Sequence, residues 1–486
     1  MRLIIFIFLF TVSALSQQLY FPPLTGNQWE TMPFISAGWD STKTDSLFTF
    51  LEEKNTKAFL VLKDGKIVIE KYFGAFVRDS LWYWASAGKT LTSFLVGLAQ
   101  QKGHLSIQDT TSKYLGRWTS APLEKERLIT VRNQLTMTSG LNDAVPDHYC
   151  TLPECLLYKA DAGTRWAYHN GPYTLLDSVM QKAAGQTLNQ FFISELRAKT
   201  GMTGFFLKSG YNNVFYSTAR SMARFGLLIL NRGRWDTTAV MSDTAYFREM
   251  TNTSQDLNKS YGYLWWLNGK ESYMLPQSQF VFPGSMNPYA PDDMISALGK
   301  NGQFLSIVPG RNIIMVRMGN APDSSLVPFL LNNDIWKLLT PVISPVSRAE
   351  GNYKVSPFKL EQNYPNPFIV STNIKYTIPA PSHFIKGEGG AALSPSKWER
   401  LGDPGDGLSG SAQVSGTIGT SGDVLVTLKL YDILGREIAT LVNEYQYPGA
   451  YEVKLNAEEL DLSSGIYFYE IKIGGYSAVK KMLVFR

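Results

Sequence analysis

The sequence predicts an α+β fold: one antiparallel sheet built from distant segments, a helical insertion between them, and then an all-β segment. Two observations carry this prediction. Strand-like runs occur at residues 57–72 and again at residues 295–318, with helix-like apolar periodicity between them. From about Ile343 the composition changes, and short strand-like runs follow one another to residue 485.

Composition limits the possible classes of protein. The chain has 486 residues, of which 44% are hydrophobic and 18% charged, so it is long enough for more than one domain. Its formal net charge of +5 is spread along the chain. A nucleic-acid-binding surface is therefore not indicated.

Residues 1–16 have the pattern of a signal peptide. Met1-Arg2 forms a positive start, residues 3–10 are apolar, and small residues end at Ser16, where we expect cleavage. The apolar run is far shorter than the roughly 20 residues that span a bilayer, and no later segment reaches that length. The sequence thus predicts an exported protein without a stable transmembrane segment.

The first strands are expected at residues 57–62 and 66–72, joined through Asp64-Gly65, which is a hairpin turn pair. A helix should follow from Ser86, with apolar residues recurring at helical spacing and with Lys102 and Gly103 at its end. Ser86 and Lys89 are three residues apart. In a helix they share a face, with Cβ atoms about 5–6 Å apart.

Helices and strands then alternate less regularly. Helices are predicted at residues 129–135, 171–185, 188–198 and 325–339. A further helix is predicted to begin after Ser217, which would be its N-cap. Strands are predicted at residues 263–267, 295–298, 303–308 and 313–318. The domain predictions are a main domain at 17–342, a linker at 343–360 and an all-β domain at 361–486. A Gly/Ser/Pro-rich stretch at 380–422 is expected to be a flexible insertion in the last of these.

Four residues are candidates for the functional site. Ser86, Lys89, Tyr168 and Asn170 together resemble the Ser-x-x-Lys and Tyr-x-Asn motifs of the serine β-lactamase and penicillin-binding-protein superfamily. The likeness is nearest to its class C-like branch of esterases, D-amino-acid peptidases and 6-aminohexanoate-dimer hydrolases. The resemblance implies a β-lactamase-like fold over about residues 48–339.

A third segment, Lys300-Asn301-Gly302 before Gln303, stands where that superfamily usually has Lys-Thr-Gly or His-x-Gly, so the match is imperfect. By resemblance, the N–H groups of Ser86 and Gln303 would form the oxyanion hole, and Gly302 would let the strand approach the substrate. A plain hairpin turn is the alternative interpretation of this segment.

The resemblance also implies roles. Ser86 is the nucleophile, and Lys89 keeps Tyr168 or Ser86 deprotonated. Tyr168 relays the proton to the leaving group, while Asn170 orients Lys89 or the substrate. These roles need the pKa values of the lysine and the tyrosine to be lowered by burial and positive charge. His169 occupies a variable position and is not expected to act.

Two further predictions concern cysteines and cofactors. In an exported chain, Cys150 and Cys155 favour a small disulfide loop over a zinc site, for which only His148 is near in sequence, or over a catalytic thiol. No metal or nucleotide motif is present in the sequence, so no cofactor is expected.

The C-terminal segment resembles a type IX secretion sorting domain. The resemblance rests on Tyr364-Pro365-Asn366-Pro367-Phe368, on the strands after Val424, and on the ending at residues 480–486. It implies the type IX secretion machinery as partner and export through the periplasm of a Gram-negative bacterium to the cell surface or the medium. A generic carbohydrate-binding β-sandwich is the alternative.

The sequence therefore predicts a secreted serine hydrolase that cleaves an amide or ester bond of a small molecule through a Ser86 acyl-enzyme. Within enzymes, the alternative is a true β-lactamase or D,D-peptidase. The class A motif Glu-x-x-Leu-Asn is missing, which disfavours that subclass. Outside enzymes, the alternative is a catalytically silent binder of peptidoglycan-like ligands.

Overall fold

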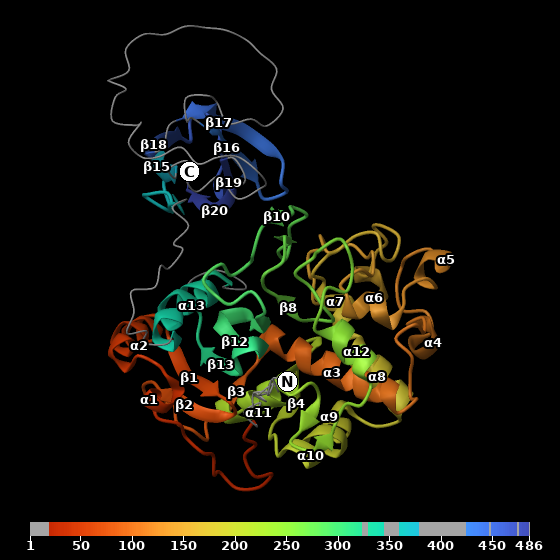
Figure 1. The fold of residues 1–486 in the computed structure, drawn as a ribbon. Coiled ribbons are helices and arrows are strands. Elements are labelled where there is room, and N and C mark those ends of the chain that lie inside the picture. The colour runs from red at the N-terminus through yellow and green to blue at the C-terminus, as the bar shows by residue number, and fades with distance from the viewer. Residues whose placement is uncertain are drawn as a thin grey trace, which may run out of the picture. The chain divides into compact units, whose positions relative to one another are not determined.

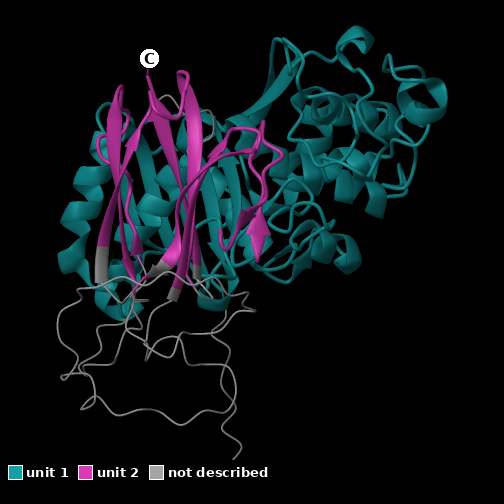
Figure 2. Cartoon of the chain, turned by 90° about the horizontal axis from the view of Figure 1, so that it is seen from above, with its two compact units in different colours: residues 1–270, 286–346 teal, residues 271–285, 347–486 magenta. Residues whose placement is uncertain are grey.

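A computed structural model describes residues 19–322, 329–344, 359–378, 424–446, 449–473 and 476–485. The predicted signal peptide, most of the predicted linker and the predicted insertion lie outside these residues. The chain forms two compact units, coloured in Figure 2. Unit 1 comprises Met1–Lys270 and Met286–Val346, and unit 2 comprises Glu271–Ser285 and Ser347–Arg486.

The central sheet of unit 1 is antiparallel and joins segments that are far apart in sequence, as predicted (Figure 1). Its strand order is β2-β1-β13-β12-β11-β8. The strands are β1 (Thr56–Lys63), β2 (Lys66–Tyr72), β8 (Trp266–Leu267), β11 (Ile295–Gly299), β12 (Gln303–Val308) and β13 (Ile313–Gly319). The first strand pairs with the last, with Leu60 opposite Val316. The central sheet therefore joins strands from both sides of the helical insertion in the sequence.

The hairpin between β1 and β2 turns at the predicted pair. Asp64 and Gly65 have φ values of 51° and 86°, which are the left-handed angles that a two-residue hairpin turn requires. A Cβ at Gly65 would also collide with the backbone of Tyr20. Glycine is thus required there by both angle and space.

Helix α11 (Ala219–Leu230) packs against β1, β12 and β13. Gly226 makes this approach possible, because a Cβ there would come within 2.8 Å of Ile314 and 2.9 Å of Leu305. The predicted cap of this helix is wrong by one residue. Thr218 is the N-cap and accepts a hydrogen bond from the Ser221 N–H, while Ser217 ends strand β5 (Asn212–Ser217).

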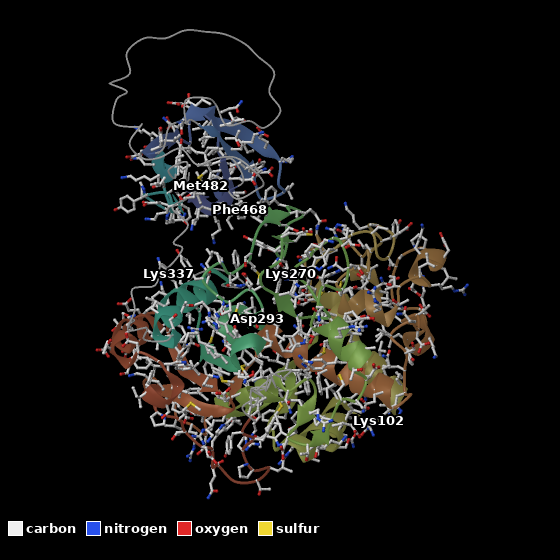
Figure 3. All side chains as sticks on the ribbon, viewed as in Figure 1. Lys102, Lys270, Asp293, Lys337, Phe468 and Met482 are labelled. Carbon is white, nitrogen blue, oxygen red and sulfur yellow. A yellow bond between two sulfur atoms is a disulfide. The ribbon has the colours of Figure 1, made fainter. Side chains whose placement is uncertain are left out.

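The predicted Ser86 helix is present as η2 (Ala85–Ala87) followed by α3 (Gly88–Gln101). It ends as predicted, with Lys102 as C-cap, labelled in Figure 3, and with Gly103 at φ 74°. Other helices of unit 1, apart from α11 and those of the helical insertion, are α1 (Phe34–Ala37), η1 (Ser41–Lys43), α2 (Thr44–Glu53), α12 (Thr244–Met250), η5 (Lys300–Gly302), η6 (Pro309–Arg311) and α13 (Phe329–Ile343).

The helical insertion lies between α3 and α11. It contains α4 (Ser112–Leu115), α5 (Leu123–Glu126), α6 (Val131–Leu135), η3 (Pro153–Cys155), α7 (Asn170–Thr174), α8 (Leu176–Ala184), α9 (Leu188–Phe192), the π-turn η4 (Ile193–Arg197) and α10 (Ala198–Thr200). The single helix predicted at 188–198 is thus interrupted. Small sheets complete the unit: β3 (Trp82–Tyr83) with β5 and β4 (Phe205–Ser209), and β6 (Arg234–Trp235) with β7 (Thr238–Ala239).

The predicted strand at 263–267 is reduced to β8. Leu264 has a φ of 64°, which interrupts an extended strand, and Tyr261 forms an isolated bridge with Trp266. The chain therefore turns tightly just before it joins the central sheet.

Unit 2 is rich in β-structure, as predicted for its C-terminal part. One sheet has the order β17-β16-β19-β20 and another β14-β15-β18. The strands are β14 (Lys359–Leu360), β15 (Ser371–Ile378), β16 (Val424–Asp432), β17 (Glu437–Gln446), β18 (Gly449–Asn456), β19 (Gly465–Ile473) and β20 (Tyr476–Val484), together with the pair β9 (Ser272–Tyr273) and β10 (Phe282–Pro283). Strands of both sheets contribute to one apolar core that includes Tyr376, Leu430 and Tyr469.

Candidate active site

Ser86 lies in the tight turn η2, two residues before α3 begins at Gly88. Ala85, which precedes it, has a φ of 47°, an uncommon angle for a residue with a Cβ and one often found at functional sites. Trp84 anchors the turn, because its backbone N–H donates to the Phe215 carbonyl at 2.8 Å and its Nε1 donates to Ser217 Oγ at 2.8 Å. The position of Ser86 is thus fixed from outside its own helix.

Lys89 lies one turn further on and is 5% exposed. Its Nζ donates a hydrogen bond to Ser86 Oγ at 3.2 Å. Nζ also lies 4.1 Å from the ring centroid of Tyr173 and 5.2 Å from that of Tyr168. Burial lowers the pKa of Lys89 to about 7, against a smaller opposing effect of Asp177. Near neutral pH, therefore, a substantial fraction of the amine is uncharged.

Tyr168 comes from the segment just before α7 and is brought beside Lys89. Its ring stacks on Trp266 with centroids 5.9 Å apart and planes at 19°. Burial raises the pKa of the Tyr168 phenol, and a side-chain hydrogen bond with Ser86 opposes that rise. The sequence predicted a lowered pKa for this tyrosine. The structure differs because desolvation outweighs every favourable contact of the phenolate.

Asn170 begins α7 and is buried, with an Oδ1 that has no hydrogen-bond partner among the described residues. His169, between the two motif residues, is also buried, and both its ring nitrogens likewise have no partner in the described part of the chain. Burial lowers the pKa of His169 to about 4, so its imidazole is neutral near pH 7.

The third segment forms the turn η5 between β11 and β12. Asn301 and Gly302 have φ values of 62° and 76°. The end of β11 meets the Ser86 turn closely, because a Cβ on Gly299 would lie 2.6 Å from the Trp84 carbonyl oxygen and 2.9 Å from the Ala87 nitrogen. The fold therefore brings this turn next to the turn that carries Ser86.

The side chains of this segment differ in orientation. Lys300 is exposed, and Asn301 Nδ2 donates to the Tyr83 hydroxyl at 2.7 Å. Gln303 is fully buried and bonds both backbone groups of Gly319, donating from Nε2 at 2.6 Å and accepting at Oε1 at 3.0 Å. The side-chain amide of Gln303 is thus occupied by hydrogen bonds within the fold.

Arg317 braces the same turn, and sequence reasoning missed it. This fully buried guanidinium donates to the carbonyls of Gly302 at 2.7 Å and Asn301 at 3.1 Å. A Cβ on Gly302 would collide with Arg317, which is a second reason for glycine there. A single cation within the apolar strand β13 was the available sequence signal.

Cys150 and Cys155 are joined by a disulfide. The loop packs on the start of α7: the Gly171 N–H donates to the His148 carbonyl at 3.0 Å, and a Cβ on Gly171 would lie 2.5 Å from the Cys150 carbonyl oxygen. The disulfide therefore holds a loop that supports the segment carrying Tyr168 and Asn170.

Residues 51–331 match the model of the beta-lactamase family, which is more than half of the chain. This chain belongs to the β-lactamase family, whose members are serine hydrolases. Residues 413–485 match the secretion system C-terminal sorting domain. That domain indicates export to the cell surface or the medium.

Among curated proteins, the chain is 24% identical over 299 residues to an uncharacterized protein of Alkalihalophilus pseudofirmus, covering 54% of this chain and 82% of that one. Among solved structures it is similar to a candidate 6-aminohexanoate-dimer hydrolase from Bacillus anthracis, with a TM-score of 0.51, 15% identity, and 65% and 87% of the two chains covered. A candidate β-lactamase from Bacteroides dorei gives a TM-score of 0.50, 18% identity, and 63% and 99% covered. These structures support the fold.

Within the residues that the structure describes, no helix has both the length and the hydropathy to cross a membrane. The same residues contain no group of three or more His, Cys, Asp or Glu side chains arranged to hold a metal ion.

Proposed function

We propose that this chain is an exported serine hydrolase that cleaves an amide or ester bond of a small molecule through an acyl-enzyme on Ser86. One observation carries the proposal: the buried Lys89 amine lies 3.2 Å from Ser86 Oγ, and burial lowers its pKa to about 7. A nucleophile and a base at hydrogen-bond distance, with the base near its working pKa, are the requirements for acyl transfer.

Acylation begins when the uncharged Lys89 amine takes the Ser86 proton. The Ser86 oxygen then forms a bond to the substrate carbonyl carbon, and the carbonyl oxygen becomes an oxyanion. The backbone N–H groups of Ser86 and Gln303 are the expected donors to that oxyanion. Lys300, Asn301 and Asn170 are expected to contact the rest of the substrate, and Gly302 keeps the turn close to it.

Collapse of the intermediate breaks the bond to the leaving group, which needs a proton. Tyr168 is a neutral phenol and can supply that proton while it takes one from the Lys89 ammonium, so that charges balance. A water molecule then attacks the acyl-enzyme by the reverse proton path and releases the acid. The raised pKa of Tyr168 supports this role as a donor rather than a resting phenolate.

The delivery part of the proposal concerns the two ends of the chain. Residues 1–16 act as a signal peptide, and the C-terminal domain is read by the type IX secretion machinery of a Gram-negative bacterium. The match of residues 413–485 to a sorting domain supports the role proposed for the C-terminal domain.

The test is labelling with a fluorophosphonate probe followed by peptide mass mapping. The adduct should map to Ser86, and Ser86→Ala should remove it without changing the circular dichroism spectrum. Wild-type protein that is folded yet unlabelled and inactive would favour the silent binder of peptidoglycan-like ligands.

The substrate class is tested with three probes: p-nitrophenyl esters, amino-acid amides and a chromogenic cephalosporin. Turnover of esters or amides with slow cephalosporin hydrolysis is expected. Fast cephalosporin hydrolysis would instead identify a β-lactamase, and release of terminal D-alanine a D,D-peptidase.

A further inference from the structure

Asp177 is a buried carboxyl group next to the candidate site, and no motif includes it. It lies in α8 between the apolar residues Leu176 and Val179 and is 8% exposed. Moving a carboxylate out of water is costly unless hydrogen bonds or a counter-charge replace the lost water. The contacts of Asp177 therefore need an explanation.

The hydrogen bonds of Asp177 are incomplete. Its Oδ2 accepts from Asn213 Nδ2 at 2.7 Å, and its Oδ1 is buried without a hydrogen-bond partner among the described residues. No basic side chain lies within ion-pair distance of it in that part of the chain. Lys89 is the charged group that interacts electrostatically with Asp177, since each residue affects the ionisation of the other.

Tyr173 interacts with both Lys89 and Asp177. Its ring centroid is 4.1 Å from Lys89 Nζ, its hydroxyl is 3.1 Å from Thr92 Oγ1, and Asp177 acts on it electrostatically. Tyr173 and Asp177 are four residues apart along the consecutive helices α7 and α8, which is the spacing of one helical face. The face that carries Tyr173 toward Lys89 thus also carries Asp177.

The surrounding titratable groups are few. Lys89 comes from α3, Tyr173 from α7, and Tyr168 and Tyr261 from neighbouring segments; burial raises the pKa of all three phenols, so they stay neutral near pH 7. From α4, Lys113 and Tyr114 are both bonded to Asp109, and α9 contributes no titratable side chain. In the described structure, Asp177 is the acid whose charge acts on Lys89.

We propose that Asp177 is a positioning residue that serves as the buried counter-charge of Lys89 and sets the pH at which this amine becomes the base for Ser86. The proposal rests on the proposed function of Lys89. An ammonium group interacting with a carboxylate keeps its proton to higher pH than one without it. The pair titrates as a unit, and Asp177 would thereby tune when the hydrolase becomes active.

The experiment is the pH profile of kcat/KM, on an ester that the wild type turns over, for Asp177→Asn. This variant removes the charge, keeps the shape and can still accept a hydrogen bond from Asn213. The acid limb should move to lower pH by up to about one unit, which is the effect of a full unit charge roughly 10 Å away in a medium of effective dielectric about 20. The shift is reduced to the extent that Asp177 is protonated across the limb, because burial raises its pKa to about 7. An acid limb at the wild-type pH in folded Asp177→Asn would overturn the proposal.

A second variant keeps the test decisive if Asp177→Asn does not fold. Asn213→Ala retains the carboxyl group but removes its donor, which makes the carboxylate less stable and should move the limb in the same direction by less. Glu70→Gln is the matched control, because it also removes a partly buried carboxylate of unit 1 but one that is paired with Arg220. Its acid limb should coincide with that of the wild type.

Failure of this proposal differs from failure of the proposed function. If the probe does not label Ser86 in the wild type, the proposed function is wrong. If Ser86 is labelled but the limbs of Asp177→Asn and wild type coincide, only the role of Asp177 is wrong. A merely structural role would lower stability in Asp177→Asn without moving the limb.

Discussion

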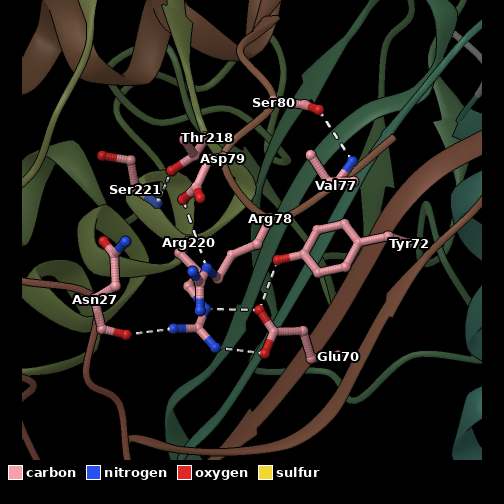
Figure 4. A network of polar contacts seen from close by, with 10 residues as sticks. All are labelled: Asn27, Glu70, Tyr72, Val77, Arg78, Asp79, Ser80, Thr218, Arg220 and Ser221. Atoms are coloured by element: carbon pink, nitrogen blue, oxygen red, sulfur yellow. Dashed lines mark hydrogen bonds and ion pairs between the residues drawn. The ribbon is translucent and has the colours of Figure 1, made fainter. Parts of the chain in front are cut away.

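Two buried or partly buried charge clusters of unit 1 are built in opposite ways. In the Glu70 cluster, shown in Figure 4, the Arg220 guanidinium donates twice to Glu70, from Nε and Nη2, each at 2.6 Å. The Tyr72 hydroxyl donates to the same carboxylate at 2.6 Å, and Arg220 Nη1 donates to the Asn27 carbonyl at 2.7 Å. The charges of this cluster are thus well satisfied.

The Lys89 cluster lacks such satisfaction. Lys89 Nζ contacts one hydroxyl and two aromatic rings, and Asp177 Oδ1 has no hydrogen-bond partner among the described residues. The pKa values move accordingly. Burial lowers the pKa of Lys89 and raises that of Asp177, which disfavours both charged forms. For Glu70, burial would raise the pKa, but hydrogen bonds from Arg220 and Tyr72 outweigh it and the pKa is lowered.

We interpret this difference as that between a cluster suited to stabilising the fold and a cluster suited to the proton transfer proposed for Lys89. A saturated, bidentate pair holds its protons and charges over a wide pH range. An under-satisfied buried pair sits near the point where a proton can leave, which is what a catalytic base needs. The Glu70 cluster should therefore affect folding, and the Lys89 cluster should affect turnover.

The largest expected effect is from Lys89→Ala. Loss of the base should lower kcat/KM by about 10²–10⁴-fold, with similar losses for Tyr168→Phe, measured by stopped-flow probe acylation. The losses in the double variant should be far from additive, because both residues act on one proton path. Ester hydrolysis at the wild-type rate by folded Lys89→Ala would contradict the mechanism, because Lys89 would then not be the base.

The second effect is on the pH dependence of the wild type. Because the pKa of Lys89 is lowered to about 7, kcat/KM should rise about tenfold per pH unit below that value and level off above it. The measurement is kcat/KM between about pH 5 and 9, with buffers matched in ionic strength. A profile that is flat through pH 7 would exclude Lys89 as the titrating base.

A third prediction concerns Arg220→Met, which leaves Glu70 without its bidentate partner. Loss of charged hydrogen bonds at a partly buried site should lower the free energy of unfolding by about 2 kcal/mol, with kcat unchanged. Since the folded pKa of Glu70 lies below its ordinary value of 4.5, the contribution of the pair is fully present above pH 4.5 and is lost as the pH falls below 4.5 through the lower folded pKa. Urea unfolding of wild type and variant should therefore converge in acid. If Arg220→Met lowered kcat without lowering stability, the Glu70 cluster would serve turnover rather than folding, which would contradict the comparison of the two clusters.

Reduction of the Cys150–Cys155 disulfide should have an effect of similar or smaller size. For so short a loop, chain entropy gives about 2 kcal/mol. Because the loop supports the start of α7, the double variant Cys150→Ser/Cys155→Ser should also slow acylation at temperatures near the midpoint of its thermal unfolding. Arg220→Met should not slow acylation under the same conditions. Thiol labelling of denatured, unreduced wild type checks the pairing, and two labelled thiols would contradict it.

The smallest effect is expected from removing the C-terminal domain. Both clusters lie in unit 1, so a chain of residues 17–345 should keep the wild-type kcat on any substrate that the full protein hydrolyses. The comparison is made at equal active-site concentration, determined by probe titration. A large fall in kcat in a folded truncated protein would mean that delivery and catalysis are not separable.

The sequence by itself determined the local elements. The hairpin at Asp64-Gly65 follows from residues adjacent in the chain, and the helical spacing of Ser86 and Lys89 from residues three apart. The same holds for the strands of the all-β segment, whose alternation is visible in short windows. Each of these depends on interactions within one element or between neighbouring elements, which composition and periodicity report directly.

Only the tertiary structure decided what surrounds those residues. In the folded chain, Tyr168 and Asp177 interact with Lys89, and Arg317 donates a hydrogen bond to the Asn301 carbonyl. None of these pairs is close in sequence, so periodicity carries no information about them. The pKa of Tyr168 was wrongly predicted for the same reason: desolvation depends on how completely distant segments exclude water, and that is a property of the packed fold rather than of any motif.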